Sequence, residues 1–378
     1  MIDIQKLSET YGVNAERGEG GNFPVFLQRV KGKKMLVITD EHTLPLSELI
    51  VNALKENGNS VKRCHLPEEE PVADERTVET VRRAAEDCDY LLAVGSGTLN
   101  DVAKYAGFLL GGKPSGIYAT APSMDGFTSS VTPLIKDGRK ISITTQVAKD
   151  VLMDLNLLAH APAMMIGAGV GDILAKYCCL TDWRIATFLA GDEYHEEAAA
   201  LMYEAVKACD DSIPALIRKE PSGVEKLMDA LLVSGYAMVI AGNSRVASGA
   251  EHHMSHFLEE DFLHRGKRIP LHGVKVGLGT TVSLYLYHTL RTRAPFAGCE
   301  RVYEEADKLP SVESVQETLA ALNCPTRFSE LDIPKETVRT MFKEGYKIRL
   351  QRFTILSLYC TYGLMTDEVL DELLEKFY

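Results

Sequence analysis

Short apolar runs alternate with amphipathic stretches through the first 150 residues, and this alternation constrains the fold more than any other feature of the sequence. The apolar runs have the length of buried strands, and the stretches of about ten residues between them have helical spacing. The pattern predicts strands at 35–39, 61–66, 90–94 and 116–119, and helices at 47–57, 77–87 and 99–110. Strands separated by helices form βαβ units, so this part is predicted to be a parallel sheet covered by helices.

The pattern changes near residue 150. A short hairpin is predicted just before the change, with arms at 131–135 and 141–145. Beyond it, helical periodicity covers 172–190, 194–209, 224–240, 250–262, 274–290 and 335–363, and little of the sequence is typical of strands. We therefore expect an α/β domain at residues 1–158 and a mostly helical domain at residues 159–378.

Charge and cysteine content exclude several classes of partner. The chain has 53 acidic and 41 basic residues and a formal net charge of −12, so we expect neither nucleic acid nor a membrane surface as a general partner. The longest run without Asp, Glu, Lys, Arg or His, 230–244, has 15 residues and is shorter than the roughly 18 that a membrane span needs. We expect no signal peptide, since no basic region precedes an apolar stretch at the start. The eight cysteines form no CxxC pair, which is typical of reduced thiols and favours a cytoplasmic location.

A glycine turn at residues 95–101 follows the strand at 90–94 and opens the next helix. Glycines there let the backbone approach a pyrophosphate, and the start of the helix offers free amide groups. The third glycine of the common dinucleotide motif is replaced by Asn100, and the acidic residue that could bind a ribose, Asp40, precedes the turn. By itself the turn is equally consistent with a phosphate site and with a plain tight turn.

A second loop, residues 120–129, follows the strand at 116–119. Loops at the carboxyl ends of parallel strands line the ligand crevice of such sheets. The loop contains Asp125-Gly126, a dipeptide that is also typical of an ordinary turn.

Histidines gather between residues 252 and 288, where six of the ten occur. His252 and His256 are four residues apart in a predicted helix and share a face, whereas His253 points away and is expected to be a packing or surface residue. His272 comes just before the next helix, and Asp172 is expected at the start of the helix 172–190. One carboxylate and two imidazoles are typical of a catalytic metal site with an open position. The alternative is that the histidines are satisfied helix residues and that the aspartate is only a helix cap.

Taken together, five segments resemble the iron-containing alcohol dehydrogenase and dehydroquinate synthase superfamily, in the order and spacing of that family. They lie at 95–104, 121–126, 169–176, 244–256 and 271–273, and the similarity covers nearly the whole chain. The resemblance implies an α/β, Rossmann-like dinucleotide domain followed by an all-helical metal-binding domain, the dehydroquinate synthase-like arrangement. Ser96 is a departure, since a glycine is common there in the family.

The resemblance also implies roles for individual residues. Asp172, His252 and His272 match the metal ligands; Asp125, Asp172 and His256 match positions that contact substrate, and Asp172 and His256 are the expected catalytic residues. Asp40 would bind the adenine ribose and favour NAD over NADP, because its charge repels a 2′-phosphate. The residues expected to hold the dinucleotide are Asp40, Gly95, Ser96, Gly97, Thr98, Leu99, Asn100, Asp101, Thr120, Ala121, Pro122, Ser123 and Ser129.

The implied activity is a metal-dependent, NAD(P)H-linked, reversible reduction of dihydroxyacetone phosphate, a small phosphorylated three-carbon substrate, to sn-glycerol 1-phosphate. Arg245 and Lys275 lie close in sequence to the ligand histidines and are candidates for binding the phosphate. Two alternatives stay open: a glycerol dehydrogenase acting on an unphosphorylated polyol, and a lyase like dehydroquinate synthase, although that family usually has Glu where this chain has Asp172. The donor set suits zinc, nickel or iron. Family habit implies a homodimer or a larger homo-oligomer.

Overall fold

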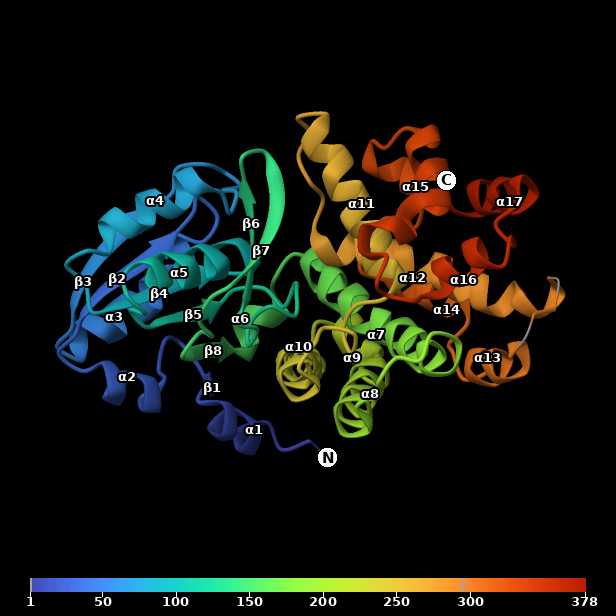
Figure 1. Ribbon diagram of the computed structural model, residues 1–378. Coiled ribbons are helices and arrows are strands. Elements are labelled where there is room, and N and C mark those ends of the chain that lie inside the picture. Colours follow the sequence, from blue (N-terminus) through green and yellow to red (C-terminus); the bar gives the residue numbers. More distant parts are fainter. Residues whose placement is uncertain (1, 294, 297) are drawn as a thin grey trace. The chain divides into compact units, whose positions relative to one another are not determined.

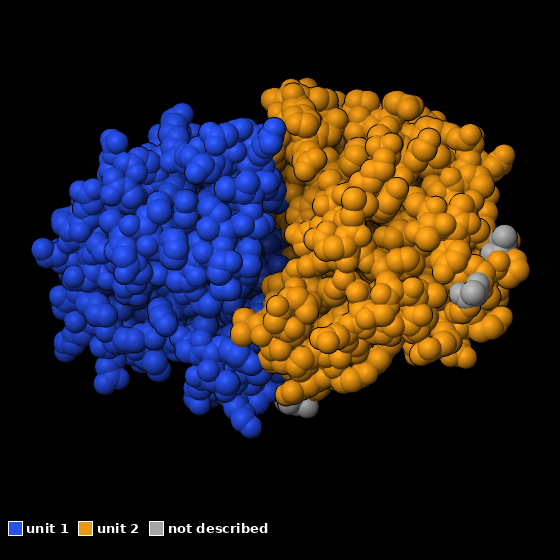
Figure 2. Space-filling view, in the orientation of Figure 1, with its two compact units in different colours: residues 1–162, 214–236 blue, residues 163–213, 237–378 orange. Residues whose placement is uncertain are grey.

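The computed structural model describes residues 2–293, 295–296 and 298–378. The chain forms two compact units, shown in different colours in Figure 2. The first unit is Met1–Pro162 with Pro214–Tyr236, and the second is Ala163–Ile213 with Ala237–Tyr378.

The first unit is built from alternating helices and strands (Figure 1). In chain order these are α1 (Ile4–Tyr11), β1 (Asn14–Gly18), α2 (Pro24–Val30), β2 (Lys34–Thr39), η1 (Pro45–Ser47), α3 (Glu48–Glu56), β3 (Ser60–His65), α4 (Glu75–Ala84), β4 (Tyr90–Gly95), α5 (Gly97–Leu109), β5 (Ser115–Ala119), β6 (Val131–Lys136), β7 (Arg139–Thr144), β8 (Asp150–Asp154) and α6 (Leu155–Ala159).

Six of these strands form one parallel sheet, in the order β1-β8-β5-β4-β2-β3. The chain passes from β2 outward to β3 and then returns across β2 to β4, so the direction of winding reverses between β2 and β4. In open parallel sheets this reversal opens a crevice outside the carboxyl ends of the two strands, where ligands bind.

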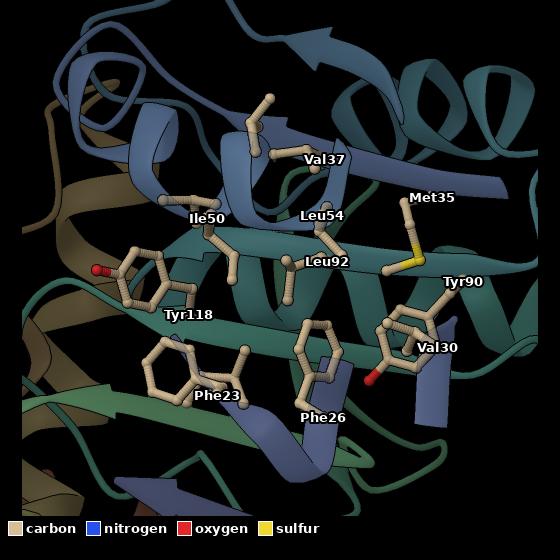
Figure 3. Close-up of a cluster of buried hydrophobic side chains, with 13 residues drawn as sticks. Phe23, Phe26, Val30, Met35, Val37, Ile50, Leu54, Tyr90, Leu92 and Tyr118 are labelled. Carbon is tan, nitrogen blue, oxygen red and sulfur yellow. The ribbon is translucent and has the colours of Figure 1, made fainter. Parts of the chain in front are cut away.

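One face of the sheet carries a cluster of buried apolar side chains (Figure 3). Helix α2 and the residue before it, Phe23, cover this cluster through two edge-to-face aromatic pairs. The ring centroids of Phe23 and Tyr118 are 5.6 Å apart, and those of Phe26 and Tyr90 are 5.9 Å apart. Helix α3 adds Ile50, Val51 and Leu54 to the same cluster. This apolar packing holds β2, β4 and β5 rigidly, and these strands end at the candidate dinucleotide loops.

The prediction of a parallel sheet is confirmed, and the strands and helices predicted within residues 35–119 are displaced by at most a few residues. The predicted hairpin is also confirmed, because β6 and β7 pair antiparallel from Val131–Thr144 to Lys136–Arg139. The strand β1 was not predicted, since its sequence Asn-Ala-Glu-Arg-Gly is polar. It pairs with β8 at the edge of the sheet, where strands need not be apolar.

The second unit is helical within its described residues. Its elements are α7 (Ala163–Leu189), α8 (Glu196–Asp210), α11 (Ala250–His264), α12 (His272–Thr289), η2 (Leu290–Thr292), α13 (Cys299–Ala306), α14 (Val312–Ala321), η3 (Phe328–Leu331), α15 (Lys335–Glu344), η4 (Gly345–Arg349), α16 (Ile355–Thr361) and α17 (Asp367–Phe377). Helices α9 (Ile213–Ile217) and α10 (Pro221–Ala241) cross from one unit to the other in sequence. Helix α7 is long and apolar enough to cross a membrane, but 83% of its most apolar window is buried inside the protein, as in a core helix.

The start of α7 corrects one prediction. The sequence placed Asp172 at the beginning of a helix, after a glycine-rich passage. In the structure the helix begins at Ala163, so Gly167, Gly169 and Gly171 lie inside it. Glycine disfavours the interior of an isolated helix, but here it lets other segments pack directly on the backbone. A Cβ on Gly167, for example, would meet the side chain of Leu322 at 2.9 Å.

Most of α10 packs with the first unit, although we expected residues 214–236 in the second domain. The domain boundary at 158–159 stays a prediction. The packing has specific contacts. Arg17 of β1 pairs with Asp229 and, at 2.9 Å, with Glu225 of α10. Thr128 donates a hydrogen bond of 2.8 Å to the Leu232 carbonyl, and a Cβ on Gly235 would meet the Thr128 carbonyl carbon at 2.9 Å. Such tertiary contacts leave no local signal in the sequence.

Asp229 predicts a pH dependence of stability. Burial raises its pKa from 3.8 to about 6, even though Arg17 acts to lower it. The folded chain therefore binds more protons than the unfolded chain between these values, and the free energy of unfolding falls as the pH rises through about 6.

In Asp229→Asn this contribution is absent. Between about pH 4 and pH 7, we expect the free energy of unfolding of the wild type to fall by on the order of 1–2 kcal/mol relative to that of the variant. Urea unfolding of both proteins across this range measures the difference. A difference that does not change with pH contradicts the prediction.

Candidate active site

In the first unit, the predicted dinucleotide residues follow the carboxyl ends of neighbouring parallel strands. Asp40 follows β2, residues 95–101 follow β4 and residues 120–123 follow β5, and these three strands are neighbours. Asp40 accepts a hydrogen bond of 2.8 Å from the Thr43 amide, which fixes its carboxylate beside the point where the winding reverses. The amide of Thr120 donates to the Gly95 carbonyl at 2.8 Å and joins the loop after β5 to the turn after β4.

Ser96, the departure from the family pattern, has a structural role. It is the residue before α5, and its hydroxyl lies 2.6 Å from the Ser123 hydroxyl and donates to the Ala121 carbonyl at 3.1 Å. A glycine could make neither bond. Ser96 therefore ties the first loop to the second at the edge where a dinucleotide would bind.

A buried lysine, Lys104, holds the far end of the second loop. It is fully buried and donates to the Ser129 carbonyl at 3.2 Å, while its ammonium pairs with Asp101 at 3.1 Å. Asn100 adds a bond of 3.3 Å to the Gly126 carbonyl. The side chains of Asn100 and Asp101 are thus used within the protein, which leaves their backbone amides as the groups that suit a phosphate.

The three predicted metal ligands converge in the second unit. One ligand atom each from Asp172, His252 and His272 lies within 4.8 Å of the other two. The Asp172 Oδ1 atom is 3.7 Å from His252 Nε2, and the His252 and His272 ring centroids are 5.2 Å apart. Ligand atoms around a tetrahedral zinc lie about 3.3 Å apart, so a small contraction would complete the site. The donor set and its spacing fit a divalent metal.

Neighbouring groups orient two of these ligands. Lys176 Nζ is 2.8 Å from Asp172 Oδ1, and both side chains are fully buried. His252 Nδ1 lies 2.9 Å from Glu251 Oε1, an arrangement that keeps the proton on Nδ1 and turns the lone pair of Nε2 toward Asp172. Burial, followed by the charge of Lys176, holds the His252 pKa well below its ordinary value, so the imidazole is neutral as metal binding requires.

Glu259 links the remaining histidines. Its Oε2 atom is 2.9 Å from His256 Nδ1, and its Oε1 atom is 3.5 Å from His272 Nδ1 and 3.4 Å from Lys275 Nζ. The carboxylate side chain is only 2% exposed. One buried carboxylate thus orients a candidate metal ligand and the candidate catalytic histidine together.

Asp182 fixes the start of the histidine-bearing helix. It accepts from the Ala250 amide at 2.7 Å, from the Ile355 amide at 2.7 Å and from the Tyr287 hydroxyl at 2.5 Å. A single buried carboxylate therefore joins α7, α11, α12 and the start of α16.

Two glycines bring the ligand-bearing helices together. Gly171 precedes Asp172 on α7, and Gly273 follows His272 on α12. A Cβ on Gly171 would meet the Gly273 carbonyl oxygen at 2.5 Å, and a Cβ on Gly273 would overlap the Ala168 carbonyl. Only backbones without side chains can approach so closely, and this approach brings Asp172 near His272.

Sequence reasoning missed some of these residues and placed others correctly. Glu259 was missed, although its position seven residues after His252, on the same helix face, was a usable signal. His253 is buried, which confirms the packing alternative and excludes the surface one. Asp125 belongs to the first unit, where its carboxylate accepts from the Ser234 hydroxyl at 2.7 Å.

The parallel sheet with its glycine turn and the helical unit with its Asp-His-His cluster agree with the comparisons to known proteins. Residues 14–162 match the family model described as iron-containing alcohol dehydrogenase. The iron-containing alcohol dehydrogenase of Thermococcus thioreducens has the same fold, with a TM-score of 0.69 and 18% identity over 97% of this chain and 98% of that chain. These findings define the fold class as that of the iron-containing alcohol dehydrogenases.

Relatives with higher sequence identity place the chain in one family of this fold class. The glycerol-1-phosphate dehydrogenase (NAD(P)+) of Bacillus licheniformis is 36% identical over 96% of this chain and 90% of its own length. The enzyme of the same name from Bacillus velezensis is 35% identical over 88% of this chain and 86% of its own length. The chain belongs to the glycerol-1-phosphate dehydrogenase family.

Proposed function

We propose that this chain catalyses the reversible, metal-dependent reduction of dihydroxyacetone phosphate to sn-glycerol 1-phosphate with NADH or NADPH. The observation that carries the proposal is the buried convergence of Asp172, His252 and His272. The names of its relatives supply the substrate class, a small phosphorylated molecule, and the coenzyme. In the reaction the ketone carbon receives a hydride, the carbonyl oxygen receives a proton, and the coenzyme is oxidised.

We assign Asp172, His252 and His272 as the ligands of zinc, nickel or iron. When bound, the metal supplies Lewis-acid stabilisation of the negative charge that develops on the substrate oxygen. The protein contributes ligands that are oriented in advance by Lys176 and Glu251.

His256 is the proposed proton donor. It lies on the same helix face as His252, with 6.4 Å between the ring centroids, and its side chain is 23% exposed. Because Glu259 accepts at Nδ1, we assign proton transfer to Nε2. Asp125, held by Ser234, is proposed to bind a substrate hydroxyl.

The loops at the sheet edge are proposed to bind the dinucleotide, with the ribose at Asp40 and the pyrophosphate at residues 95–101. The carboxylate of Asp40 repels a 2′-phosphate, so we expect NADH to be preferred over NADPH. The relatives' names include both coenzymes, which agrees with a preference and not an absolute choice.

The first test compares substrates and coenzymes on metal-reconstituted protein. Loss of reduced-nicotinamide absorbance is measured with dihydroxyacetone phosphate and with dihydroxyacetone, each with NADH and NADPH. We expect kcat/KM for the phosphorylated ketone to be at least about 100-fold higher, the range for a bound charged group. Preference for dihydroxyacetone would assign a glycerol dehydrogenase, and no oxidation with either ketone would favour a lyase.

We further propose a cytoplasmic location and a homodimer or larger homo-oligomer. All eight cysteines are free, which supports a reducing compartment. The net charge of −12 agrees with the absence of nucleic acid or a membrane surface among the partners.

A further inference from the structure

Three arginines gather beside the first turns of α11 in the second unit. Arg245 lies in the loop before α11, Arg349 ends η4 and Arg352 follows it, and η4 packs on α11. Arg352 donates to the Ser248 carbonyl at 3.2 Å and to the Ser244 hydroxyl at 2.5 Å. Arg245 donates to the Gln351 carbonyl at 3.0 Å. These bonds clamp the two segments together and fix the backbone on both sides of the cluster.

Arg349 differs from its two neighbours. Arg245 has an acidic partner, Asp192 at 2.7 Å, and Arg352 is engaged by the loop. Among the residues that the structure describes, Arg349 has no hydrogen-bond acceptor and no carboxylate within ion-pair distance. It is nevertheless partly buried, and burial lowers its pKa. A guanidinium that is withdrawn from water without an anion favours a bound anion.

Unpartnered polar side chains lie in the segments that form the arginine cluster. Both ring nitrogens of His253 are buried without a hydrogen-bond partner, and so is the Ser248 hydroxyl. Arg245, Arg349 and Arg352 bring three positive charges to this part of the second unit. In a chain of net charge −12, this is a local positive field.

The cluster also lies beside the helix that carries a candidate metal ligand. Arg352 is bonded to the Ser248 carbonyl, four residues before His252, and η4 packs on α11. In dihydroxyacetone phosphate only one methylene and one ester oxygen separate the carbonyl carbon from phosphorus, so the phosphate must bind beside the metal ligands.

The two phosphate candidates from the sequence are less suited to this role. Lys275 is 1% exposed, donates to the Pro270 carbonyl at 2.5 Å and lies 3.4 Å from Glu259. Arg245 is paired with Asp192. Each would have to give up or share an existing partner to bind a phosphate.

We propose that Arg349 binds the phosphate of the substrate, with Arg352 and Arg245 fixing the backbone that presents it. The inference rests on the proposed function, since it names the residue of that same site that selects the phosphorylated ketone. A planar guanidinium can bind two phosphate oxygens at once, which gives both affinity and orientation.

The experiment compares Arg349→Ala and Arg349→Lys with a matched control, Lys347→Ala. Lys347 lies on the same short helix, is 51% exposed and pairs with Glu344 at the surface. In Arg349→Ala we expect KM for dihydroxyacetone phosphate to rise about 10- to 100-fold, as for one lost charge-assisted bond, with KM for dihydroxyacetone unchanged. The KM of Arg349→Lys for dihydroxyacetone phosphate should lie between those of Arg349→Ala and the wild type, and the KM of Lys347→Ala should equal that of the wild type. An unchanged KM, or equal rises for both ketones, overturns the inference.

A second measurement separates this inference from the proposed function. Inorganic phosphate is titrated calorimetrically into the metal-loaded wild type and into Arg349→Ala, with metal content and melting temperature checked in both. Binding at least about tenfold weaker in the variant supports the site. Equal binding overturns it. If the wild type shows no preference for the phosphorylated ketone, the proposed function fails and this titration alone decides the role of Arg349.

Discussion

Replacement of His252 by glutamine is expected to remove the bound metal and almost all ketone reduction. Glutamine fills much of the volume of the buried imidazole, but its amide nitrogen has no free lone pair to replace that of the ring nitrogen 3.7 Å from Asp172. Replacing a residue that only orients a metal ligand commonly costs 10- to 100-fold in metal affinity or activity, so loss of a ligand itself should cost more than about 100-fold. Metal content by mass spectrometry and a competitive zinc titration measure the loss independently of turnover.

His264→Gln is the matched control, because His264 lies exposed at the end of the same helix. It should bind metal and reduce the ketone like the wild type. If His252→Gln kept one metal per chain with unchanged affinity, the assignment of His252 as a ligand would be wrong. Matching melting curves for the two variants would show that the loss does not come from unfolding.

Part of this site could be predicted from the sequence because its signals are local. The spacing of His252 and His256 places them on one helix face, and their ring centroids are 6.4 Å apart in the structure. The glycine turn at 95–101 follows a strand whose apolar run is continuous. The parallel sheet could be predicted for the same reason, since the buried strands β2, β4 and β5 each have an apolar run of their own, whereas the buried strand β8 was not predicted.

The rest depends on contacts between residues far apart in sequence. Asp172 lies ten residues into its helix, because the glycines before it serve helix packing and not a turn. Glu259 and Lys176 act through the ligands that they contact, and neither shows this role in its local sequence. Arg349 lies 97 residues after His252, and no periodicity connects the two.

Replacement of Gly273 by alanine is expected to destabilise the protein and weaken metal binding together. The added methyl group would overlap the Ala168 carbonyl oxygen and lie 2.5 Å from its carbonyl carbon, and these are backbone atoms inside α7 that cannot rotate away. Overpacking usually costs about 1–3 kcal/mol and occasionally more, and a backbone clash belongs at the upper end. The helices must separate to relieve it, which moves His272 away from Asp172.

Gly277→Ala, one turn further along α12, provides the comparison. A Cβ there would meet the Leu319 methyl groups at 3.2 and 3.3 Å, and a side chain can shift by a few tenths of an ångström. Alanine also favours a helix over glycine by about 0.5–1 kcal/mol, so this variant should be nearly neutral. Guanidinium unfolding and zinc affinity are measured for both variants. If only Gly273→Ala loses stability and zinc affinity, the close approach of α7 and α12 is what brings the metal ligands together. Wild-type stability and zinc affinity in Gly273→Ala would instead mean that the two ligands are brought together without that approach.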